Sequence, residues 1–283
     1  MENKQGGCMD TGLRTSGIAL LSLAVLASSG CATQPTPRQT PPAVAAEAAA
    51  VPPESGKAFV PPTSLHWFRV SAERRALFAQ AYRQATARLP GVDSQEGPWA
   101  VVVDADETVL DNMAYQERLA RGLPPYEKWS QENWNAWVKE EKALAFPEAV
   151  AFLNEVRLRG GLIAIVSNRS ETTCKETGSN LVKQKVPYDA LLCAKLVNPN
   201  SGVDGSVDTN KEPRFQWVHS GEAFKRPTPI RLAVFVGDNI KDCPGQSQTS
   251  FTADKFGTEC IVLPNPVYGS WDTRPYVPSE GTP

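Results

Sequence analysis

Short continuous runs of apolar and β-branched residues recur along this chain, and polar residues follow most of them directly. The runs cover residues 99–103, 162–166 and 232–236, with a further one at 260–263. A strand buried on both faces has this composition, whereas a strand with one wet face alternates apolar and polar residues. The runs therefore predict a sheet that is covered on both sides.

Helical segments are expected between these runs. The segments with helical spacing are 64–89, 147–159, 170–185 and 211–222, and a further strand is expected at 190–197. Strands that alternate with helices predict the α/β class, with a Rossmann-like parallel sheet and helices on both of its faces. The tryptophan-rich residues 112–146 are expected to form a mainly helical insert.

Charge and hydropathy exclude two broad classes of protein. The 283 residues carry 29 basic and 31 acidic side chains, a net charge of −2. This balance excludes a nucleic-acid polymer as a partner held by bulk positive charge. No apolar run beyond the N-terminus approaches the roughly 20 residues that a membrane-spanning helix needs.

The N-terminal segment has the pattern of an export signal. Arg14 precedes an apolar run at 18–27, and small residues lead directly to Cys31 as in a bacterial lipobox. We expect a signal peptide at 1–30, with Cys31 lipidated and the protein held at the outer membrane, facing the periplasm or the surface. An ordinary cleaved signal, which would leave a soluble periplasmic protein, is the alternative.

The rest of the chain divides at changes in composition. Residues 31–62 are rich in proline and alanine and are expected to be a disordered tether, because they bury too little apolar surface to fold. The folded domain is expected at 63–273, followed by a flexible tail at 274–283. The sequence leaves the oligomeric state open between a monomer and a homodimer.

Three predicted strands run straight into polar residues. Asp104 follows the first, residues 167–169 follow the second, and Gly237-Asp238-Asn239 ends the third. Ligands of a parallel sheet bind at the carboxyl ends of its strands, so these clusters are expected to meet at one edge.

The carboxylates of that edge indicate a metal. Asp104, Asp106, Asp238 and Asp242 offer oxygen ligands with no histidine nearby. This set suits a hard cation such as Mg²⁺ better than zinc. A divalent ion also relieves the repulsion between carboxylates that share one site.

Neutral and positive donors complete the requirements for phosphoryl transfer. Ser167 and Asn168 supply neutral donors and Lys211 a positive charge, which together can hold the oxygens of a phosphate. Each residue also has an ordinary structural explanation, since Asp106 and Thr108 can cap a helix and an isolated lysine is usually solvated. Their combination at the end of a buried strand favours a functional site.

Four motifs in order carry a resemblance to a known family. They are Asp104-Ala-Asp-Glu-Thr-Val-Leu-Asp-Asn112, Ser167-Asn-Arg169, Lys211-Glu-Pro-Arg214 and Gly237-Asp-Asn239 with Asp242, and the word Leu263-Pro-Asn-Pro-Val-Tyr-Gly-Ser-Trp271 follows them. The sequence resembles the haloacid dehalogenase (HAD) superfamily of phosphohydrolases. More narrowly, it resembles the class C acid phosphatases, bacterial outer-membrane lipoprotein nucleotidases also known as the lipoprotein e family. The resemblance runs from about residue 65 to 271.

The resemblance implies catalytic and metal-binding roles. Asp104 would be the nucleophile that forms an aspartyl-phosphate, and Asp106 would protonate the leaving oxygen and then deprotonate water. Mg²⁺ would bind the Asp104 carboxylate, the Asp106 backbone carbonyl and Asp238. Asp242 would act through water or as an orienting group.

It also implies how the substrate is held. Thr108, Ser167, Asn168 and Lys211 would bind the phosphate, and Arg214 would neutralise carboxylates. The substrate would be a small phosphomonoester, and members of the family hydrolyse nucleoside monophosphates.

Aromatic residues are candidates for contact with a nucleobase. Tyr115 and Tyr268 are expected to flank the base, because aromatic rings stack on bases. The tryptophans of the insert, Trp129, Trp134 and Trp137, are expected to pack in its core instead.

A lipid-anchored protein that binds haem or a nucleotide without essential catalysis is the alternative function. Haem needs an axial ligand, and the two histidines, His66 and His219, lie in no motif. We expect His66 to help fix the start of a helix.

Four cysteines remain once Cys8 and Cys31 are set aside. Cys174, Cys193, Cys243 and Cys260 permit three pairings in an exported domain. Cys174 with Cys193 and Cys243 with Cys260 would close the shortest loops, and free buried thiols are the alternative.

Overall fold

A five-stranded parallel sheet runs through the residues that this computed structural model describes, which are 58–91, 97–197 and 206–277. The strand order is β5-β4-β1-β6-β7, and every neighbouring pair is parallel. The strands are β1 (Trp99–Val103), β4 (Leu162–Ser170), β5 (Ala190–Ala194), β6 (Arg231–Gly237) and β7 (Cys260–Val262). The predicted α/β class and its parallel sheet are confirmed.

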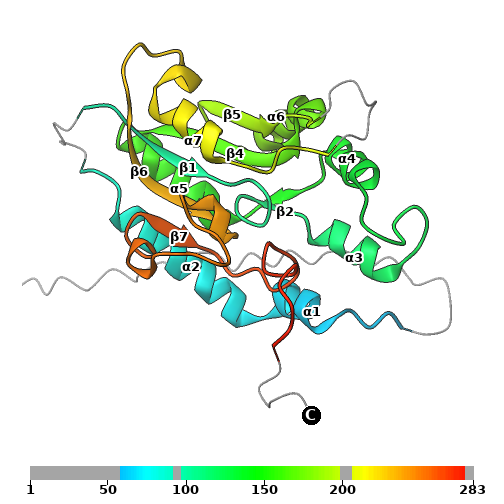
Figure 1. Ribbon diagram of the computed structural model, residues 1–283. Helices are drawn as coiled ribbons and strands as arrows, with labels where there is room; N and C mark the ends of the chain where they lie inside the picture. The colour runs from blue at the N-terminus through cyan, green and yellow to red at the C-terminus, as the bar shows by residue number, and fades with distance from the viewer. Residues whose placement is uncertain (1–57, 92–96, 198–205, 278–283) are drawn as a thin grey trace, which may run out of the picture. The chain divides into compact units, whose positions relative to one another are not determined.

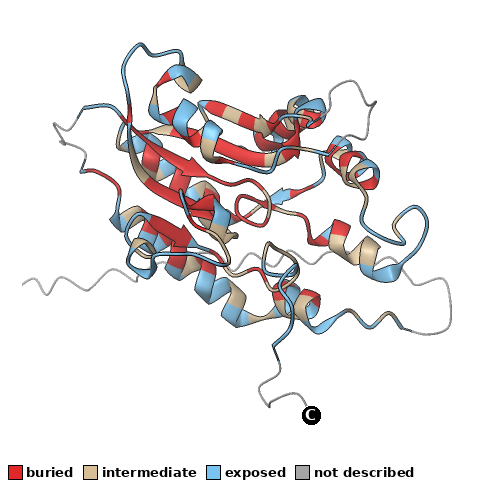
Figure 2. Ribbon diagram, in the orientation of Figure 1, coloured by how far each residue is buried: buried red, intermediate tan, exposed pale blue. Residues whose placement is uncertain are grey.

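Helices cover both faces of the sheet (Figure 1). The helices on one face are α2 (Ala72–Ala87), α5 (Pro147–Leu158) and α6 (Cys174–Lys183). They share a buried cluster with alternate residues of the strands, including Val101 and Val103. Ala100 and Val102 point the opposite way and pack with α7 (Glu212–His219). The central strands are buried, as Figure 2 shows, and burial on both faces explains why their residues are continuously apolar.

The first predicted helix, 64–89, is two helices. They are α1 (Thr63–Val70) and α2, and Ser71 between them has an extended backbone, with φ −68° and ψ 142°. The Ser71 hydroxyl accepts a hydrogen bond from the N–H of Arg74 at 2.9 Å. This N-cap stabilises the start of a new helix, so the spacing of apolar residues continues across a break.

The insert after β1 is mainly helical. It contains α3 (Met113–Arg121) and α4 (Gln131–Glu140), and Ser130 caps α4. A two-stranded antiparallel ribbon that the sequence did not reveal, β2 (Leu110–Asp111) with β3 (Leu144–Ala145), closes the insert at its base. Each of these strands has two residues, too few for a detectable alternation.

The tryptophans of the insert differ in burial. Trp137 is 2% exposed and lies in the core as expected, and Trp134 packs partly buried against it. Trp129, in the loop before α4, is 59% exposed, which corrects the expectation that it packs in the core.

Short 3-10 helices make up the remaining regular structure among the described residues. They are η1 (Glu171–Thr173), η2 (Glu222–Phe224), η3 (Ile240–Asp242) and η4 (Ala253–Lys255). Of these, η3 matters most for function, because it begins three residues after the end of β6.

Several expectations concern residues outside the described ranges. The signal peptide at 1–30, Cys31, the tether up to residue 57 and the tail from residue 278 lie there. Within the described ranges, no helix combines the length and the apolar character that crossing a membrane requires.

Candidate active site

Three carboxylates meet where the central strands end. Asp104 follows β1, Asp238 follows β6, and Asp242 is the last residue of η3. One carboxylate oxygen of each lies within 4.8 Å of the other two, and Asp104 and Asp242 are buried. Because β1 and β6 are parallel neighbours, their carboxyl ends bring these distant residues together.

Lys211 lies between two of these carboxylates. Its ammonium donates to Asp104 and, at 2.6 Å, to Oδ1 of Asp242, and 4% of its side chain is exposed. Three ionised aspartates and one lysine leave two negative charges in the cluster.

Neighbouring residues orient the other aspartate oxygens. Asn265, beyond β7, donates from Nδ2 to Oδ2 of Asp238 at 2.6 Å. The N–H of Asn239 donates to Oδ2 of Asp242 at 2.9 Å. Gly237 is required here, because a side chain at that position would collide with the Asp242 carboxylate.

Burial shifts the pKa values of Asp104, Asp238 and Lys211. Burial raises the pKa of Asp104 to about 7; Lys211 opposes this shift, and Asp242 and Asp106 add to it. Burial also raises the pKa of Asp238 well above its usual value, with further repulsion from Asp104 and Asp242. Burial alone would lower the pKa of Lys211, but Asp104 and Asp242 outweigh it and raise that pKa. Burial and mutual repulsion therefore oppose the simultaneous ionisation of Asp104 and Asp238 in the absence of a further positive charge.

The Asp106 carboxylate stands apart from this cluster. Its Oδ1 accepts hydrogen bonds from Nε of Arg169 at 2.8 Å and from Nδ2 of Asn112 at 2.9 Å. The Arg169 side chain is fully buried, whereas the Asp106 side chain is 17% exposed. The two hydrogen bonds thus fix the orientation of the Asp106 carboxylate from its buried side.

A tight turn at 105–110 carries the next residues of the first motif. The N–H of Glu107 bonds to the carbonyl of Leu110 at 2.9 Å, and Glu107 has φ 52°, where residues other than glycine are uncommon. The buried Glu107 carboxyl accepts hydrogen bonds from the N–H of Asn112 at 2.6 Å and from the hydroxyl of Tyr268. Burial, followed by repulsion from nearby carboxylates, raises the pKa of Glu107 well above its usual value, which favours the neutral acid.

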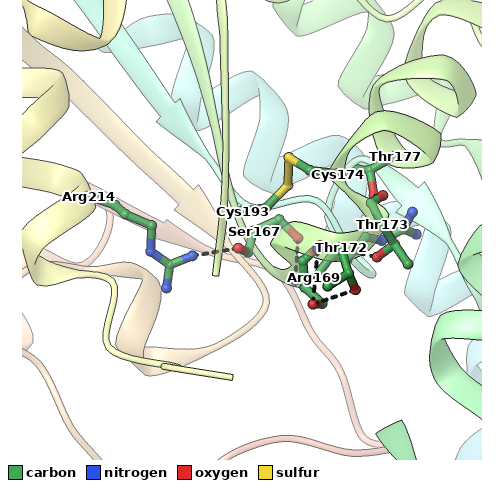
Figure 3. The surroundings of a disulfide bond; sticks show 9 residues. Ser167, Arg169, Thr172, Thr173, Cys174, Thr177, Cys193 and Arg214 are labelled. Atoms are coloured by element: carbon green, nitrogen blue, oxygen red, sulfur yellow. Dashed lines mark hydrogen bonds between the residues drawn. A yellow bond between two sulfur atoms is a disulfide. The ribbon is translucent and has the colours of Figure 1, made fainter. Parts of the chain in front are cut away.

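Arg214 of α7 holds the end of β4. Its guanidinium donates to the carbonyl of Ser167 (Figure 3). It also donates to Oδ1 of Asn168, at 2.7 Å. The same group reaches the carbonyls of Asp208 and Asn210. Arg214 was expected to neutralise carboxylates. Its hydrogen bonds go to carbonyl and amide oxygens, while its charge interacts at longer range with Asp104, Asp208 and Asp242.

Two disulfides lie near the site in the chain, one after β4 and one after Asp242. Cys174–Cys193 joins the start of α6 to β5, with the Cα atoms 5.9 Å apart (Figure 3). Cys243–Cys260 joins the residue after Asp242 to the first residue of β7, with the Cα atoms 5.7 Å apart. These are the two pairs that close the shortest loops.

A cavity of about 690 Å³ opens above the carboxylates. This volume is in the range of ligand pockets in proteins. The predicted site residues on its surface are Asp104, Asp106, Asp238, Asp242, Lys211, Asn168, Tyr115 and Tyr268. Thr108 and Ser167, expected to bind phosphate, are not among the lining residues, and both are fully buried. Oγ1 of Thr108 has no hydrogen-bond partner among the described residues.

Aromatic side chains form one wall of the cavity. Tyr115, Trp129, Trp134 and Tyr268 line it. The Tyr115 hydroxyl donates to Oδ1 of Asn133 at 2.6 Å, and its ring meets that of Trp134 edge to face, with centroids 4.9 Å apart. The hydroxyls of both tyrosines are therefore engaged by the protein.

Neither histidine belongs to this site. Nδ1 of His219 lies 3.0 Å from the carbonyl oxygen of Ile230, at the end of α7. His66 is exposed on α1. Neither lines the cavity.

Sequence reasoning left three residues without a role. Arg169, Glu107 and Asn265 contact Asp106, Tyr268 and Asp238 respectively. Arg169 and Glu107 had a detectable signal, since each is a charged residue inside a motif at the end of a buried strand. Asn265 stands in a proline-rich word after the last strand and had no such signal.

Comparison with known proteins identifies a family and similar solved structures. The HAD superfamily, subfamily IIIB (Acid phosphatase), matches residues 26–271. The structure of the class C acid phosphatase from Bacillus anthracis is similar, with 27% sequence identity and a TM-score of 0.59 over 74% of this chain and 85% of that chain. The structure of the same phosphatase with tungstate bound gives 26% identity and a TM-score of 0.58, with the same coverage.

Proposed function

This chain belongs to the acid phosphatases of HAD subfamily IIIB and is a phosphoric monoester hydrolase, and we propose that it works with Mg²⁺ through an aspartyl-phosphate on Asp104. The observation that carries the proposal is the cluster of Asp104, Asp238 and Asp242 around the ammonium of Lys211 at the carboxyl end of the sheet. Both oxygens of Asp242 are engaged by protein donors, which supports its role as an orienting residue.

The donor set fits a divalent cation. The side-chain ligands on offer are all carboxylate oxygens, and with the three aspartates ionised their charge exceeds that of Lys211 by two. Oxygen ligands favour Mg²⁺ over zinc. The Asp104 carboxylate, the backbone carbonyl of Asp106 and Asp238 would hold the ion, which supplies positive charge that reduces repulsion between Asp104 and the phosphate dianion.

The chain's own residues account for both chemical steps. In the first, an oxygen of Asp104 attacks phosphorus, the ester P–O bond breaks, and Asp106 gives its proton to the leaving oxygen. In the second, Asp106 takes a proton from water as the water oxygen attacks phosphorus. The bond between phosphorus and Asp104 then breaks, which releases phosphate and restores the free carboxylate.

Lys211 and Asn168 would hold the phosphate, because both line the cavity. Arg214 occupies Oδ1 of Asn168, which leaves the Nδ2 group free to donate to a phosphate oxygen. Thr108 and Ser167 would support the loops from beneath the cavity.

The substrates would be nucleoside 5′-monophosphates. The cavity is large enough for a nucleoside beyond the phosphate, and Tyr268 presents a partly exposed ring whose hydroxyl is already bonded. Tyr115 was expected to flank the base as well, but its side chain is fully buried, so it would support the aromatic wall from behind. Stacking on such rings is worth about 1–3 kcal/mol per base.

Asp104→Asn tests the reaction. We expect it to abolish turnover of 4-nitrophenyl phosphate and to remove the phosphorylated peptide that acid-quenched wild-type enzyme yields. Asp254→Asn, in the short helix η4 and outside the cavity, is the matched control and should keep full activity. An Asp104→Asn variant with near-normal turnover would refute the proposal.

Tyr268→Ala tests the substrate class. We expect kcat/KM to fall roughly 5- to 150-fold for nucleoside monophosphates, the equivalent of the stacking energy, and little for glycerol phosphate. Tungstate, which the Bacillus anthracis phosphatase binds, is a tetrahedral oxyanion like phosphate and should inhibit competitively. Equal losses for both substrates would contradict a role in base binding.

Export would place the enzyme where these disulfides form. We propose a signal peptide at 1–30, lipidation at Cys31, a tether at 31–62, a phosphatase domain at 63–273 and a tail at 274–283. The two disulfides support export, because disulfides form and persist in oxidising compartments. Cys31→Ala should move the protein from the membrane to the soluble fraction. An unchanged membrane fraction would count against the lipid anchor.

A further inference from the structure

Arg169 places a positive charge in the interior beside the cavity. It lies near the end of β4, its side chain is fully buried, and it is not among the residues that line the cavity. It therefore does not touch substrate. A buried charge is costly unless it is paired, and the carboxylate of Asp106 is its ionic partner.

A second residue engages the same carboxylate oxygen. Nδ2 of Asn112 donates to Oδ1 of Asp106 at 2.9 Å. The Oδ1 atom of Asn112 accepts hydrogen bonds from Nη2 of Arg169 at 3.0 Å and from Nε1 of Trp137 at 2.8 Å. Both of these groups are donors only, so the orientation of the Asn112 amide follows from its partners.

The two carboxylate oxygens of Asp106 therefore differ in their hydrogen bonding. Every hydrogen bond that its carboxylate accepts from the described residues ends on Oδ1, and the side chain borders the cavity. An oxygen that already accepts several donors has little capacity to carry a proton as well. The proton exchanged with substrate would therefore be carried by Oδ2.

We propose that Arg169 and Asn112 are positioning residues that hold Oδ1 of Asp106 and leave Oδ2 as the atom that transfers the proton. This inference rests on the proposed role of Asp106 as acid and base. Trp134 supports the arrangement, since the guanidinium of Arg169 lies 5.6 Å from the centroid of its ring.

The test uses substrates that differ only in the leaving group. An alkyl phosphate needs protonation as its P–O bond breaks, whereas 4-nitrophenolate leaves readily without it. In Arg169→Met, we expect kcat/KM to fall about 10²-fold or more for glycerol phosphate and less than about tenfold for 4-nitrophenyl phosphate. Because kcat/KM reports steps up to the first irreversible one, the later hydrolysis of the phosphoenzyme does not obscure the difference.

Controls separate positioning from general damage. Arg157→Met removes an arginine whose aspartate partner, Asp189, lies outside the cavity, and it should leave both substrates unaffected. Arg169→Lys, which keeps the charge but cannot hold both partners, decides the question if Arg169→Met does not fold. In an Asp106→Asn background, Arg169→Met should add no further dependence on the leaving group.

The outcomes distinguish this inference from the proposed function. Equal losses for both substrates, or no loss, in the folded Arg169 variants would overturn the positioning role while Asp104→Asn still abolishes turnover. If Asp104→Asn stays active, the proposed reaction itself fails. A leaving-group effect that persists in the Asp106→Asn background would show that Arg169 acts other than through Asp106, which also overturns the inference.

Discussion

The ammonium of Lys211 joins the carboxylates of Asp104 and Asp242, although 107 residues separate Lys211 from Asp104. Asp104 arrives on β1, the central strand, and Lys211 arrives just before α7, which covers one face of the sheet. The contact thus joins the proposed nucleophile to the residue proposed to hold the phosphate.

Replacing Lys211 tests the importance of this contact. In Lys211→Met, we expect kcat/KM to fall about 10²- to 10³-fold, because a preorganised positive donor is lost at the phosphate. The pKa of Asp104 should rise further, since Lys211 opposes its upward shift. Lys183→Met, which removes a 59% exposed lysine paired with Glu141, is the control, and equal activity of the two variants would contradict the assignment.

Metal binding should be visible without any assay of activity. Removal of divalent ions should lower the melting temperature, and Mg²⁺ at about 100 times its Kd should add about 2.7 kcal/mol to the free energy of unfolding. Asp238→Asn should require far more Mg²⁺ for the same shift, whereas Asp254→Asn should respond like the wild type. A melting temperature indifferent to chelation and to Mg²⁺ would exclude the proposed ion.

Glu140 should make stability depend on acid pH. Arg118 donates to both of its oxygens, and this pairing, opposed by burial and aided by Lys142, lowers the pKa of Glu140 from 4.5 to about 2. A lowered native pKa means that the stabilisation is complete above pH 4.5 and is lost as pH falls toward 2. Because the pair is partly exposed, we expect roughly 1 kcal/mol.

Glu140→Gln measures this contribution. Urea unfolding should find the variant less stable than the wild type at pH 6, with the difference shrinking as pH approaches 2. Glu222→Gln, in the short helix η2, provides a comparison for removing one negative charge. A difference that stays constant from pH 6 to pH 2.5 would contradict the pairing as its source.

The Cys243–Cys260 disulfide should affect metal binding as well as stability. By the chain-entropy model, a loop of this size contributes about 3 kcal/mol. Cys243 directly follows Asp242, so Cys243→Ser/Cys260→Ser should also raise the Mg²⁺ concentration that gives half-maximal activity. Cys174→Ser/Cys193→Ser removes the disulfide that closes a loop of similar length, and it should lower stability without changing the Mg²⁺ requirement. The same Mg²⁺ requirement in both double variants would refute the distinction.

The sheet and the clustered aspartates could be predicted because their signals are local. Strands such as 99–103 are apolar throughout only if both faces are covered, and polar residues at parallel strand ends meet at one edge. The order of the motifs then carried the family resemblance, which implied the roles of their residues. Asp104 and Asp238 needed no knowledge of side-chain directions, because the topology alone brings them together.

The residues that escaped prediction depend on side-chain direction. Arg214 follows Lys211 by three positions, yet it turns toward β4 and holds Ser167 and Asn168. Arg169 stands in a recognised motif, but only the folded chain reveals that it faces Asp106. The break at Ser71 could not be predicted for a related reason. One hydroxyl cap separates α1 from α2, and the apolar residues of both helices read as one continuous helical pattern in the sequence.

The strand order has a consequence for the timing of synthesis. The first strand to leave the ribosome, β1, becomes the middle of the sheet, and its neighbours on one side, β6 and β7, are made last. Lys211, Asp238 and Asn265 are all synthesised after Asp104, so the site around Asp104 is complete only once the last of them, Asn265, has been made. A chain that crossed a membrane before folding would carry no hydrolytic activity in the compartment that made it.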